Sequence, residues 1–250
     1  MNYTKQTIIT NQRLMRDIFL LQVTRPEGEI RPGQFFMLKT WNDELTLMRP
    51  ISVYRYDKQC VWFMYRVAGK GTRWLSETGQ LDRNSDIMLL GPLGNGFPCE
   101  EVHGRIALVG GGIGIPPLYE TAKKLTALGN QVDVYLGYKD ALFAFEEFED
   151  VCQNIFISSE KGFEGYKGFI TDLLKPEQYD AVFTCGPWVM MRKIVELCRQ
   201  SKTPVWCSME KHMGCGIGAC LTCSCKTTEG MKRTCKDGPV FRGEELKVES

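Results

Sequence analysis

The sequence has almost no excess charge of either sign and no long apolar run. Its 31 basic and 30 acidic residues leave a formal net charge of +1, so it offers no basic field to hold nucleic acid. No stretch approaches the ~20 consecutive apolar residues of a membrane-spanning helix, and the first residues lack an apolar signal-peptide core. These absences argue against a nucleic-acid-binding, membrane-spanning or secreted protein and predict a cytoplasmic one.

Histidine is scarce, whereas cysteine is abundant. Neither His103 nor His212 stands in an acid–base constellation, and the sequence shows no Ser/His/Asp arrangement and no paired-carboxylate site. Its 11 cysteines are an odd number, which in a chain without a secretory signal indicates a reducing compartment where thiols bind metal. The sequence therefore offers no acid–base site, and its thiols are the candidate reactive groups.

One C-terminal stretch carries the spacing of a metal-ligand set. Its motif is C-x4-C-x2-C followed by a later cysteine, which is the spacing of plant-type [2Fe–2S] ligation; the four residues are Cys215, Cys220, Cys223 and Cys235. Glycines in this stretch permit unusual backbone dihedrals, so the loop can curl and point its N–H groups at the sulfurs. Zinc, which usually takes two C-x2-C pairs, and inert thiols are the alternatives.

Two neighbours of this motif need an interpretation. Cys225 follows Cys223 closely, but the four-cysteine spacing is complete without it, so we interpret Cys225 as an inert neighbour. His212 precedes the loop and is interpreted as an ordinary surface residue, with a role as an outer donor to the cluster as the alternative.

Residues 1–100 alternate short β-prone runs with turn residues. We expect a short helix at 71–79 and strands at 5–10, 18–23, 34–39, 48–54, 59–67 and 87–90. Six antiparallel strands with few helices predict a closed barrel, which removes exposed sheet edges.

Two motifs in this segment predict a flavin phosphate site. The first is a strand-like run in which an arginine fork suits a pyrophosphate and the following groups suit the polar edge of a flat ring: Arg49, Pro50, Ile51 and Ser52. The second is a glycine loop entering a helix, with Gly71 and Thr72, where N–H groups can meet a phosphate. Tyr65 and Arg66 are candidates to line the ring or the adenosine. A plain strand edge and a plain turn are the alternatives.

Residues 101–207 alternate strands and helices, which predicts a doubly wound parallel sheet. We expect strands at 105–110, 131–137, 155–158, 180–184 and 204–208, and helices at 117–127, 145–152, 169–174 and 188–199. The first strand ends in a glycine turn with Gly111, Gly112 and Gly114, which resembles a phosphate cradle but lacks the last glycine of G-x-G-x-x-G. A tight turn without a ligand is the alternative.

Two further features of this segment bear on a nicotinamide site. Cys185, Gly186 and Pro187 follow a strand at its carboxyl end, where ligands of such sheets bind, so we expect Cys185 to face the reactive ring, with a buried filler role as the alternative. Glu160 is expected to hold ribose hydroxyls and favour NAD, although Lys161 beside it argues the opposite.

The last segment, 208–250, contains the cysteine loop and two short β-like runs, 231–234 and 239–241, which we expect to form a hairpin at Asp237-Gly238. Three domains are thus expected: an FAD-binding barrel at 1–100, an NAD-binding α/β domain at 101–207 and a cluster domain at 208–250. Because nicotinamide moves two electrons and the cluster moves one, a flavin, which does both, must lie between them.

The motifs resemble those of the ferredoxin–NADP reductase superfamily and, within it, of the electron-transfer subunits of NAD-dependent (class 1B) dihydroorotate dehydrogenases. The resemblance spans nearly the whole chain and is carried by the segments 49–52, 69–72, 91–97, 110–117, 185–187, 215–223 and 235–241. The cysteine motif with its ending Asp-Gly-Pro-Val-Phe is the most specific of these.

The resemblance implies cofactors, residues and a partner. FAD would be held by 49–52, by Met64, Tyr65 and Arg66, and by Gly71 and Thr72, and NAD by the glycine turn and 185–187. The implied partner is a TIM-barrel subunit with FMN that oxidises dihydroorotate in pyrimidine biosynthesis, in a two-plus-two heterotetramer. Electrons would run from FMN through the [2Fe–2S] cluster and FAD to NAD.

Two other classes of function share parts of this pattern. An electron-transfer subunit that serves a hydrogenase, a sulfite reductase or a ferredoxin has the same cofactor motifs. A zinc-stabilised binding module without enzymatic activity is the alternative from another class, and visible absorbance distinguishes it from a flavin and iron–sulfur protein.

Overall fold

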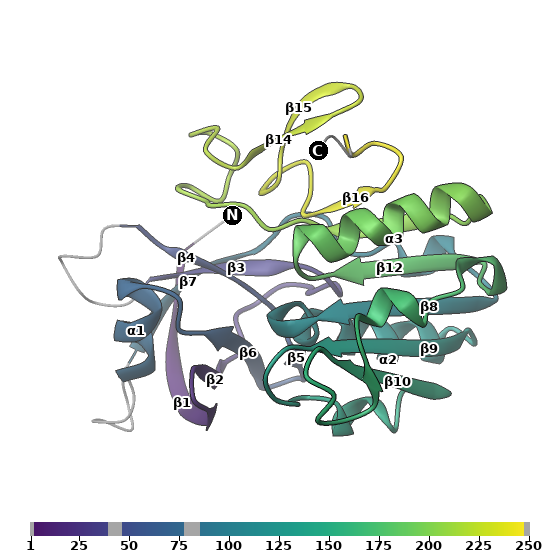
Figure 1. Cartoon of the computed structure of the whole chain (residues 1–250). Helices are drawn as coiled ribbons and strands as arrows, with labels where there is room; N and C mark the ends of the chain where they lie inside the picture. The colour runs from purple at the N-terminus through teal and green to yellow at the C-terminus, as the bar shows by residue number, and fades with distance from the viewer. Residues whose placement is uncertain (1–2, 40–46, 78–85, 248–250) are drawn as a thin grey trace.

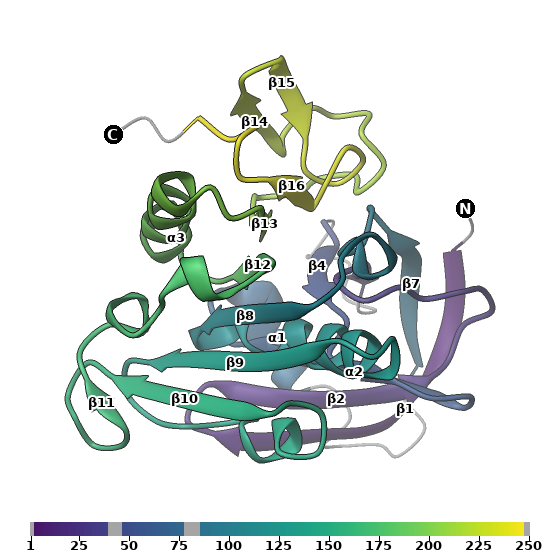
Figure 2. The same ribbon diagram turned by 90° about the vertical axis from the view of Figure 1, so that its right-hand side faces the viewer.

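The computed structural model describes residues 3–39, 47–77 and 86–247. It contains a seven-stranded antiparallel sheet, a second seven-stranded sheet that is mainly parallel, and a two-stranded hairpin. Figures 1 and 2 show the cysteine-rich C-terminal segment, in yellow, above both larger sheets. Among the helices of the described residues, none is long and apolar enough to cross a membrane.

The N-terminal lobe is built from seven short strands. Their order in the sheet is β4-β3-β7-β1-β2-β6-β5, and every pairing is antiparallel. The bounds are β1 (Tyr3–Met15), β2 (Ile18–Thr24), β3 (Phe35–Lys39), β4 (Arg49–Ser52), β5 (Arg55–Tyr56), β6 (Cys60–Arg66) and β7 (Asp86–Leu93).

The two edge strands of this sheet, β4 and β5, are consecutive in the chain, and this closes the barrel. Between them, Val53 N donates to Gln34 O at 3.0 Å and Tyr54 N donates to Trp62 O at 2.9 Å. The segment therefore crosses from the β3 side to the β6 side. The expected strand 48–54 ends at Ser52, and β5 is a seventh strand beyond the six expected. The predicted antiparallel barrel is confirmed, and its closure leaves few unpaired edge groups.

One helix accompanies the barrel. Helix α1 (Lys70–Glu77) matches the expected helix at 71–79, of which the last two residues lie outside the described ranges. It packs Leu75, which is 1% exposed, into the barrel core, and Asn11 Nδ2 donates to the carbonyl oxygen of Leu75 at 2.7 Å. The helix is thereby fixed on the barrel with its N-terminus near β4 and β6 (Figure 1).

The second lobe is the predicted doubly wound sheet. Its order is β11-β10-β9-β8-β12-β13-β16, and only β16 is antiparallel to its neighbour. The bounds are β8 (Arg105–Gly111), β9 (Gln131–Tyr138), β10 (Asn154–Ser159), β11 (Tyr166–Lys167), β12 (Ala181–Cys185), β13 (Val205–Ser208) and β16 (Val240–Arg242), with helices α2 (Tyr119–Ala127) and α3 (Trp188–Ser201).

Alternation along the strands places the two helices on opposite faces. Ile106 and Leu108 of β8 share a core with α2, whereas Ala107 and Val109 share a core with α3. Strands buried on both faces are typical of a parallel sheet covered by helices on each side.

Two helices expected in this lobe are wrong. The expected helices at 145–152 and 169–174 are single 3-10 turns, Glu146–Phe148 and Ile170–Asp172. Further 3-10 turns lie at Cys99–Glu101, Gly112–Gly114, Pro116–Leu118 and Pro176–Gln178.

The C-terminal segment does not form the expected hairpin at Asp237-Gly238. Strand β15 (Gly230–Arg233) pairs backwards with β14 (Ser224–Thr227), and β16 adds to β13 of the central sheet. Asp237 instead accepts from Arg233 N at 2.7 Å and from Arg233 Nε at 3.0 Å, which holds a local turn. The predicted third segment thus contributes a strand to the second lobe.

The two lobes share one hydrophobic core. It contains Tyr54 and Phe97 from the N-terminal part of the chain together with Ile115, Phe183 and Cys185 from the α/β lobe. The rings of Phe97 and Phe183 stack with centroids 5.0 Å apart at 11°. A second contact joins the cysteine segment to the barrel, because Cys223 and Cys235 lie in one buried cluster with Phe35, Met37, Met48, Leu90 and Leu93. Both junctions are thus formed by buried side chains.

Candidate functional site

The cysteine loop directs backbone donors at its sulfurs, as predicted. Cys215 Sγ accepts from the N–H groups of Ile217, Ala219 and Cys220 at 3.5, 3.3 and 3.4 Å. Cys235 Sγ accepts from Gly218 N at 3.1 Å. Gly216 and Gly218 have φ of +72° and +82°, the left-handed region that glycine adopts without strain. Such donors stabilise negative charge on sulfur and tune the potential of a cluster.

The four motif cysteines stand as two pairs. Cys223 Sγ lies 3.3 Å from Cys235 Sγ, and Cys220 is hydrogen-bonded to Cys215. In the part of the chain that is described, no three Cys, His, Asp or Glu side chains gather around one point. A dinuclear cluster needs four thiolates around two irons, so a set of two thiol pairs fits it.

The ionisation of two of these thiols differs with their surroundings. Hydrogen bonds, first from Thr222 and then from Cys215, lower the pKa of Cys220 to about 6. Burial and the neighbouring Cys223 raise the pKa of Cys235 to about 12. Cys220, on the exposed side of the loop, therefore ionises more readily than Cys235, on the buried side.

Cys225 points away from the other cysteines. It is 5% exposed and belongs to the core formed with α3, whereas Cys223 faces the barrel. Cys225 is the second residue of β14, whereas Cys223 lies in the turn before it. Side chains two positions apart share a face only when both residues lie in a regular strand. Here the turn before β14 separates them. His212 is exposed.

The two predicted flavin motifs meet in the barrel lobe. The Arg49 guanidinium lies directly on Gly71, where a Cβ would overlap it, and Arg49 Nη1 donates to the carbonyl oxygen of Leu47. Thr72 Oγ1 accepts from Ala68 N at 2.9 Å and from Gly69 N, so it holds the start of α1. A guanidinium beside a helix N-terminus offers charge and N–H donors to a pyrophosphate.

The side chains of β6 divide between the two faces of the barrel. Tyr65 is 1% exposed, donates to Asn11 Oδ1 at 3.1 Å and stacks on Phe19, so its ring belongs to the barrel core. The expectation that the Tyr65 side chain lines a ring or an adenosine is therefore wrong, and only its backbone remains available. Met64 faces the shared core between the lobes. The period of two along a strand could have separated them.

Arg66, at the end of β6, reaches towards the α/β lobe. It pairs with Asp17 at 3.3 Å, and its Nη2 lies 3.9 Å from where a Cβ of Gly112 would stand. Gly112 has φ +52°, a conformation that favours glycine. The arginine thus stands beside the glycine turn on which the nicotinamide prediction rests.

The glycine turn packs against the segment Cys185-Gly186-Pro187. A Cβ on Gly114 would lie 2.6 Å from Gly186 Cα, and one on Gly111 would lie 3.0 Å from Pro187 Cδ. The two segments end the neighbouring strands β8 and β12, in which Gly110 pairs with Cys185. The structure therefore brings the two predicted nicotinamide motifs together at the carboxyl edge of the sheet, where ligands of such sheets bind.

The Cys185 thiol does not open to a cleft. It is 2% exposed in the shared core, and burial, with a smaller contribution from Glu210, raises its pKa to about 12. The Cys185 thiol is therefore protonated and uncharged at neutral pH. A contact between this thiol and a nicotinamide ring remains a prediction. Glu160 follows β10 and is exposed, and Lys161 pairs with Asp140 at 2.7 Å rather than with Glu160.

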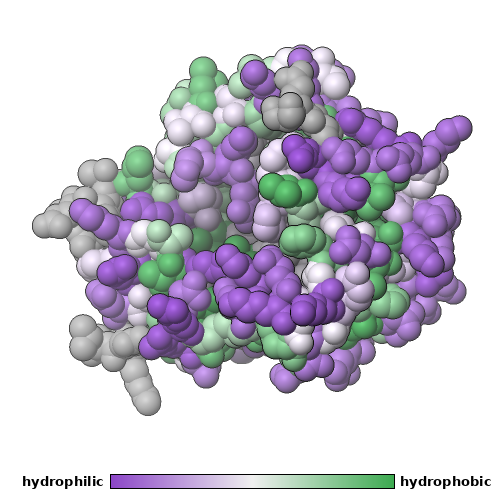
Figure 3. Space-filling view, in the orientation of Figure 1, coloured by the Kyte–Doolittle hydropathy of each residue, from purple (hydrophilic) through white to green (hydrophobic). Residues whose placement is uncertain are grey.

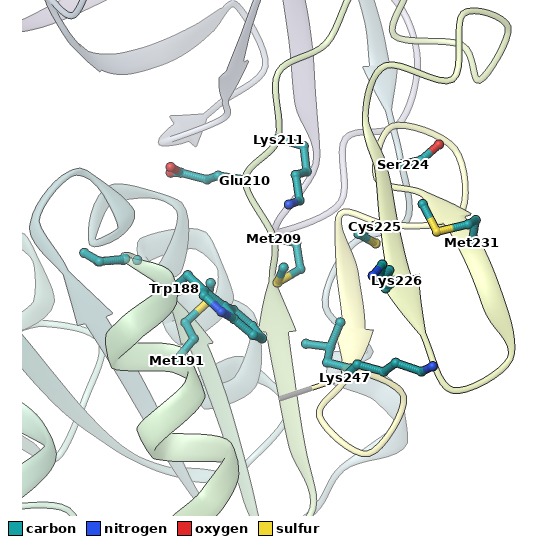
Figure 4. A pocket seen from close by; sticks show the side chains of 13 residues that line it. Trp188, Met191, Met209, Glu210, Lys211, Ser224, Cys225, Lys226, Met231 and Lys247 are labelled. Carbon is teal, nitrogen blue, oxygen red and sulfur yellow. The ribbon is translucent and has the colours of Figure 1, made fainter. Parts of the chain in front are cut away.

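Sequence reasoning missed Glu210. Glu210 follows β13 at the same sheet edge as Cys185. Its place after a predicted strand could have marked it as a candidate, because ligands bind at this edge. Part of its side chain is exposed to solvent. Partial burial raises the pKa of the Glu210 carboxyl, and the positive charge of Arg66 opposes this shift. Glu210 lines a cavity of about 590 Å³ together with Trp188 and Met209 (Figure 4).

A closed antiparallel barrel, joined to a doubly wound sheet with its glycine turn at the junction, is the architecture of ferredoxin–NADP reductases. A ferredoxin–NADP+ reductase from Neisseria gonorrhoeae aligns over 80% of this chain and 91% of its own with a TM-score of 0.60 at 17% identity, a likeness of fold alone. The structure titled as an NADH-dependent reduced ferredoxin–NADP oxidoreductase aligns over 97% and 90% with a TM-score of 0.84 at 30% identity.

The sequence comparisons identify the family. Residues 210–247 match the model described as the iron–sulfur cluster binding domain of dihydroorotate dehydrogenase B. The dihydroorotate dehydrogenase B (NAD(+)) electron transfer subunits of Clostridium acetobutylicum and Clostridium perfringens are 45% and 44% identical, each over 98% of this chain and 97% and 98% of their own. The chain belongs to the family of dihydroorotate dehydrogenase B electron transfer subunits, and the predicted family is confirmed.

Proposed function

We propose that this chain carries electrons from dihydroorotate oxidation, performed by a partner subunit with FMN, through a [2Fe–2S] cluster and FAD to NAD+ in pyrimidine biosynthesis. The proposal rests on the four motif cysteines in residues 215–235, which stand as two thiol pairs. They lie in a chain that matches an electron transfer subunit over 98% of its length. Zinc-stabilised binding is the weaker reading, because residues 210–247 match an iron–sulfur domain.

The proposed cluster ligands are Cys215, Cys220, Cys223 and Cys235. Backbone N–H groups of residues 217–220 stabilise charge on Cys215 and Cys235, and the barrel residues Met37 and Leu93 exclude water from the opposite side. These residues hold and tune a one-electron centre.

The proposed FAD site lies where β4 meets α1. Arg49 and the N-terminus of α1 at Gly71 and Thr72 receive the pyrophosphate. The ring is bordered by Pro50, Ile51 and Ser52 of β4 and by the backbone of Met64, Tyr65 and Arg66 in β6. A bound flavin exchanges two electrons with nicotinamide and single electrons with a cluster. Met48, adjacent to Arg49, already lies in one buried cluster with Cys223 and Cys235, so the two cofactor sites adjoin.

The proposed NAD site is the carboxyl edge of the central sheet. Gly112 leaves room for a phosphate beside Arg66, Gly111 and Gly114 let the turn pack closely on the segment 185–187, and Gly186 and Pro187 border the nicotinamide position. Cys185 walls that position as a neutral thiol. Glu160 is proposed to bind the ribose hydroxyls, because it is exposed directly after β10 of the sheet.

The proposed assembly is a two-plus-two heterotetramer with the FMN-containing catalytic subunit, in the cytoplasm. The name shared by the curated relatives, electron transfer subunit, supports a catalytic partner. A ferredoxin-linked function is the second candidate, because an NADH-dependent ferredoxin–NADP oxidoreductase is 30% identical over 97% of the chain. The identity of 45% to the dihydroorotate dehydrogenase subunit favours the first.

Anaerobic purification of the native complex tests the proposal. We expect flavin and iron–sulfur absorbance in this chain, a co-purifying chain with FMN, and reduction of NAD+ on addition of dihydroorotate. A nickel or sirohaem subunit in place of the FMN chain would assign the protein to another electron-transfer system. A colourless chain that contains zinc would overturn the redox function altogether.

A further inference from the structure

One residue makes the directional contacts between the barrel and the cysteine segment (209–247). Buried apolar side chains also meet there, since Phe35 lies in one cluster with Cys223 and Cys235, but apolar packing has no preferred direction. In the described part of the chain, every hydrogen bond between residues 3–97 and the cysteine segment is made by Asn95. Hydrogen bonds depend on distance and angle, so this residue can fix where the segment stands.

Asn95 makes four hydrogen bonds to residues 237–240. Its backbone N–H donates to the carbonyl oxygen of Gly238 at 2.7 Å. Its Nδ2 donates to the carbonyl oxygens of Asp237 and Val240 at 3.1 and 3.2 Å, and its Oδ1 accepts from Val240 N at 3.2 Å. Both ends of the side-chain amide are therefore used on one short stretch of backbone.

The stretch that Asn95 holds lies at the base of the cysteine segment. The carbonyl oxygen of Pro239 accepts from Met209 N at 2.8 Å, so the start and the end of the loop are joined there. Gly94 packs against the same point, because a Cβ on it would lie 2.4 Å from Pro239 Cδ. In Figures 1 and 3 the segment rests above the barrel lobe, so a tilt about this base would move the whole loop.

The proposed ligand Cys235 lies in a turn that ends at this base. Arg233 N donates to Asp237 Oδ2 at 2.7 Å, and Asp237 N donates to the carbonyl oxygen of Arg233 at 2.7 Å. These two bonds close the turn around Cys235, whose Sγ accepts from Gly218 N at 3.1 Å. A displacement of residue 237 would therefore carry Cys235 and the loop backbone with it.

On the other side, Asn95 is connected to the strand proposed to border the flavin ring. Gln34, which is 5% exposed, donates from Nε2 to the carbonyl oxygen of Gly94 at 2.7 Å. The carbonyl oxygen of Gln34 accepts from Val53 N at 3.0 Å, and Val53 directly follows Ser52 of β4. A continuous series of hydrogen-bonded residues thus runs from β4 to the turn of Cys235.

We propose that Asn95 is a positioning residue, which holds the turn of Cys235 at a fixed distance from the flavin strand and so sets the rate of electron transfer between the cluster and FAD. The inference rests on the proposed function and adds to it a residue outside the proposed ligand sets. Two one-electron transfers from the cluster, with one proton from water, supply the hydride that reduces NAD+. Each transfer slows steeply as the distance between the two centres grows.

The test compares three variants of the full chain, each in complex with the catalytic subunit. Asn95→Ala removes the three side-chain hydrogen bonds, and because Asn95 is exposed it leaves no buried void. Asn95→Asp keeps the acceptor for Val240 N but turns a charged oxygen towards two carbonyl oxygens. Asn130→Ala is the matched control, since Asn130 Nδ2 donates to the carbonyl oxygen of Leu125 at 3.1 Å within the α/β lobe.

Two kinds of measurement separate position from stability. Stopped-flow absorbance follows reduction of the flavin and then of the cluster by NADH, and hydrogen–deuterium exchange follows the backbone N–H groups of Met209 and Val240. We expect cluster reduction to slow at least about threefold in Asn95→Ala and further in Asn95→Asp, and both N–H groups to exchange at least about threefold faster. Flavin reduction, NADH oxidation by ferricyanide, cluster absorbance and the cluster midpoint potential should match the parent. Asn130→Ala should match the parent in every one of these measurements.

Two results would overturn the positioning role and leave the proposed function standing. If exchange accelerates while cluster reduction keeps the parent rate in both Asn95 variants, Asn95 contributes only to the stability of the segment. If cluster reduction slows together with a shifted potential or lost cluster absorbance, Asn95 acts on the cluster itself and not on its distance from FAD. A parent complex that holds flavin but no iron–sulfur cluster would overturn the proposed function, and the positioning role with it.

Discussion

The Arg49 guanidinium rests on Gly71, so that the first residue of β4 and the start of helix α1 form a single corner, the proposed pyrophosphate site. Neither group marks a phosphate site when considered separately, since arginines at strand ends and glycines in turns are both common. Their contact joins a fixed fork of donors to free N–H groups at a helix start. The corner exists only because residue 71 has no side chain.

Gly71→Ala is therefore expected to weaken FAD binding. The added Cβ would overlap the Arg49 side chain and displace it from the corner, and loss of a charged bidentate contact is expected to raise the dissociation constant for FAD by about tenfold or more. The measurement is FAD titration of the flavin-depleted chain. Gly69→Ala is the matched control, because a Cβ at Gly69 meets no atom within 4 Å. Equal affinities for both variants would show that the corner does not hold the flavin.

Cys220→Ser is expected to abolish dihydroorotate-dependent NAD+ reduction and to spare NADH oxidation by an artificial acceptor. The first reaction needs the one-electron centre, whereas the second needs only nicotinamide and flavin. Cys225→Ala is the control, since Cys225 faces the α3 core and not the motif cysteines. We expect this variant to keep the cluster absorbance. Equal loss of both activities in Cys220→Ser would make the loop a structural element of the fold.

Asp133→Asn is expected to lower the free energy of unfolding by about 2–4 kcal/mol, because a buried charged network loses its centre. Asp133 is 0% exposed and accepts from Arg105 Nη2 at 2.7 Å and from Tyr179 OH at 2.9 Å. Urea unfolding monitored by circular dichroism measures the change. Asp140→Asn removes the exposed pair with Lys161 and should leave the midpoint unchanged. If Asp133→Asn unfolds with the same free energy as the parent, the network orients these side chains without adding net stability.

Much of the fold follows from local pattern. Runs such as Ile106–Val109 are buried on both faces and predict a covered parallel strand, and the cysteine spacing indicates its ligand set without any tertiary information. Short elements fail where tertiary context decides. The runs at 145–152 and 169–174 have helical composition, yet each forms only one 3-10 turn, whereas the equally short α1 packs Leu75 into the barrel core.

The sites show the same limit. The turn at Gly111–Gly114 and the segment at Cys185 end two strands that neighbour each other only after the chain has crossed the sheet, so their contact follows from topology. Tyr65 was predicted as a lining residue because it precedes the glycine loop, but alternation along β6 turns its ring inwards. Glu210 was overlooked because a lone carboxylate has no motif, and only its place beside β12 makes it a site residue.

The contact between Glu120 and the barrel makes the stability of the chain depend on pH. Glu120 on α2 is 5% exposed, and its Oε1 accepts from the backbone N–H of Tyr56 at 3.2 Å. Burial raises its pKa above the ordinary value of about 4.3, and the hydrogen bond from Tyr56 opposes that shift only in part. An acid whose folded pKa is raised favours folding in its protonated form. Its stabilising contribution is full below the unfolded pKa and is lost as the pH rises through the folded pKa.

Glu120→Gln removes this titration while keeping the size of the side chain. We expect the free energy of unfolding of the parent, relative to Glu120→Gln, to increase as the pH is lowered from 7.5 to 5, because protonation relieves the desolvated carboxylate. Parallel urea titrations of both chains at each pH measure this difference, and acid effects common to both cancel. A difference that is constant with pH would show that solvent reaches the carboxylate freely. A difference that shrinks towards pH 5 would show that the ionised form is stabilised by Tyr56 and Lys123, and that these contacts outweigh burial.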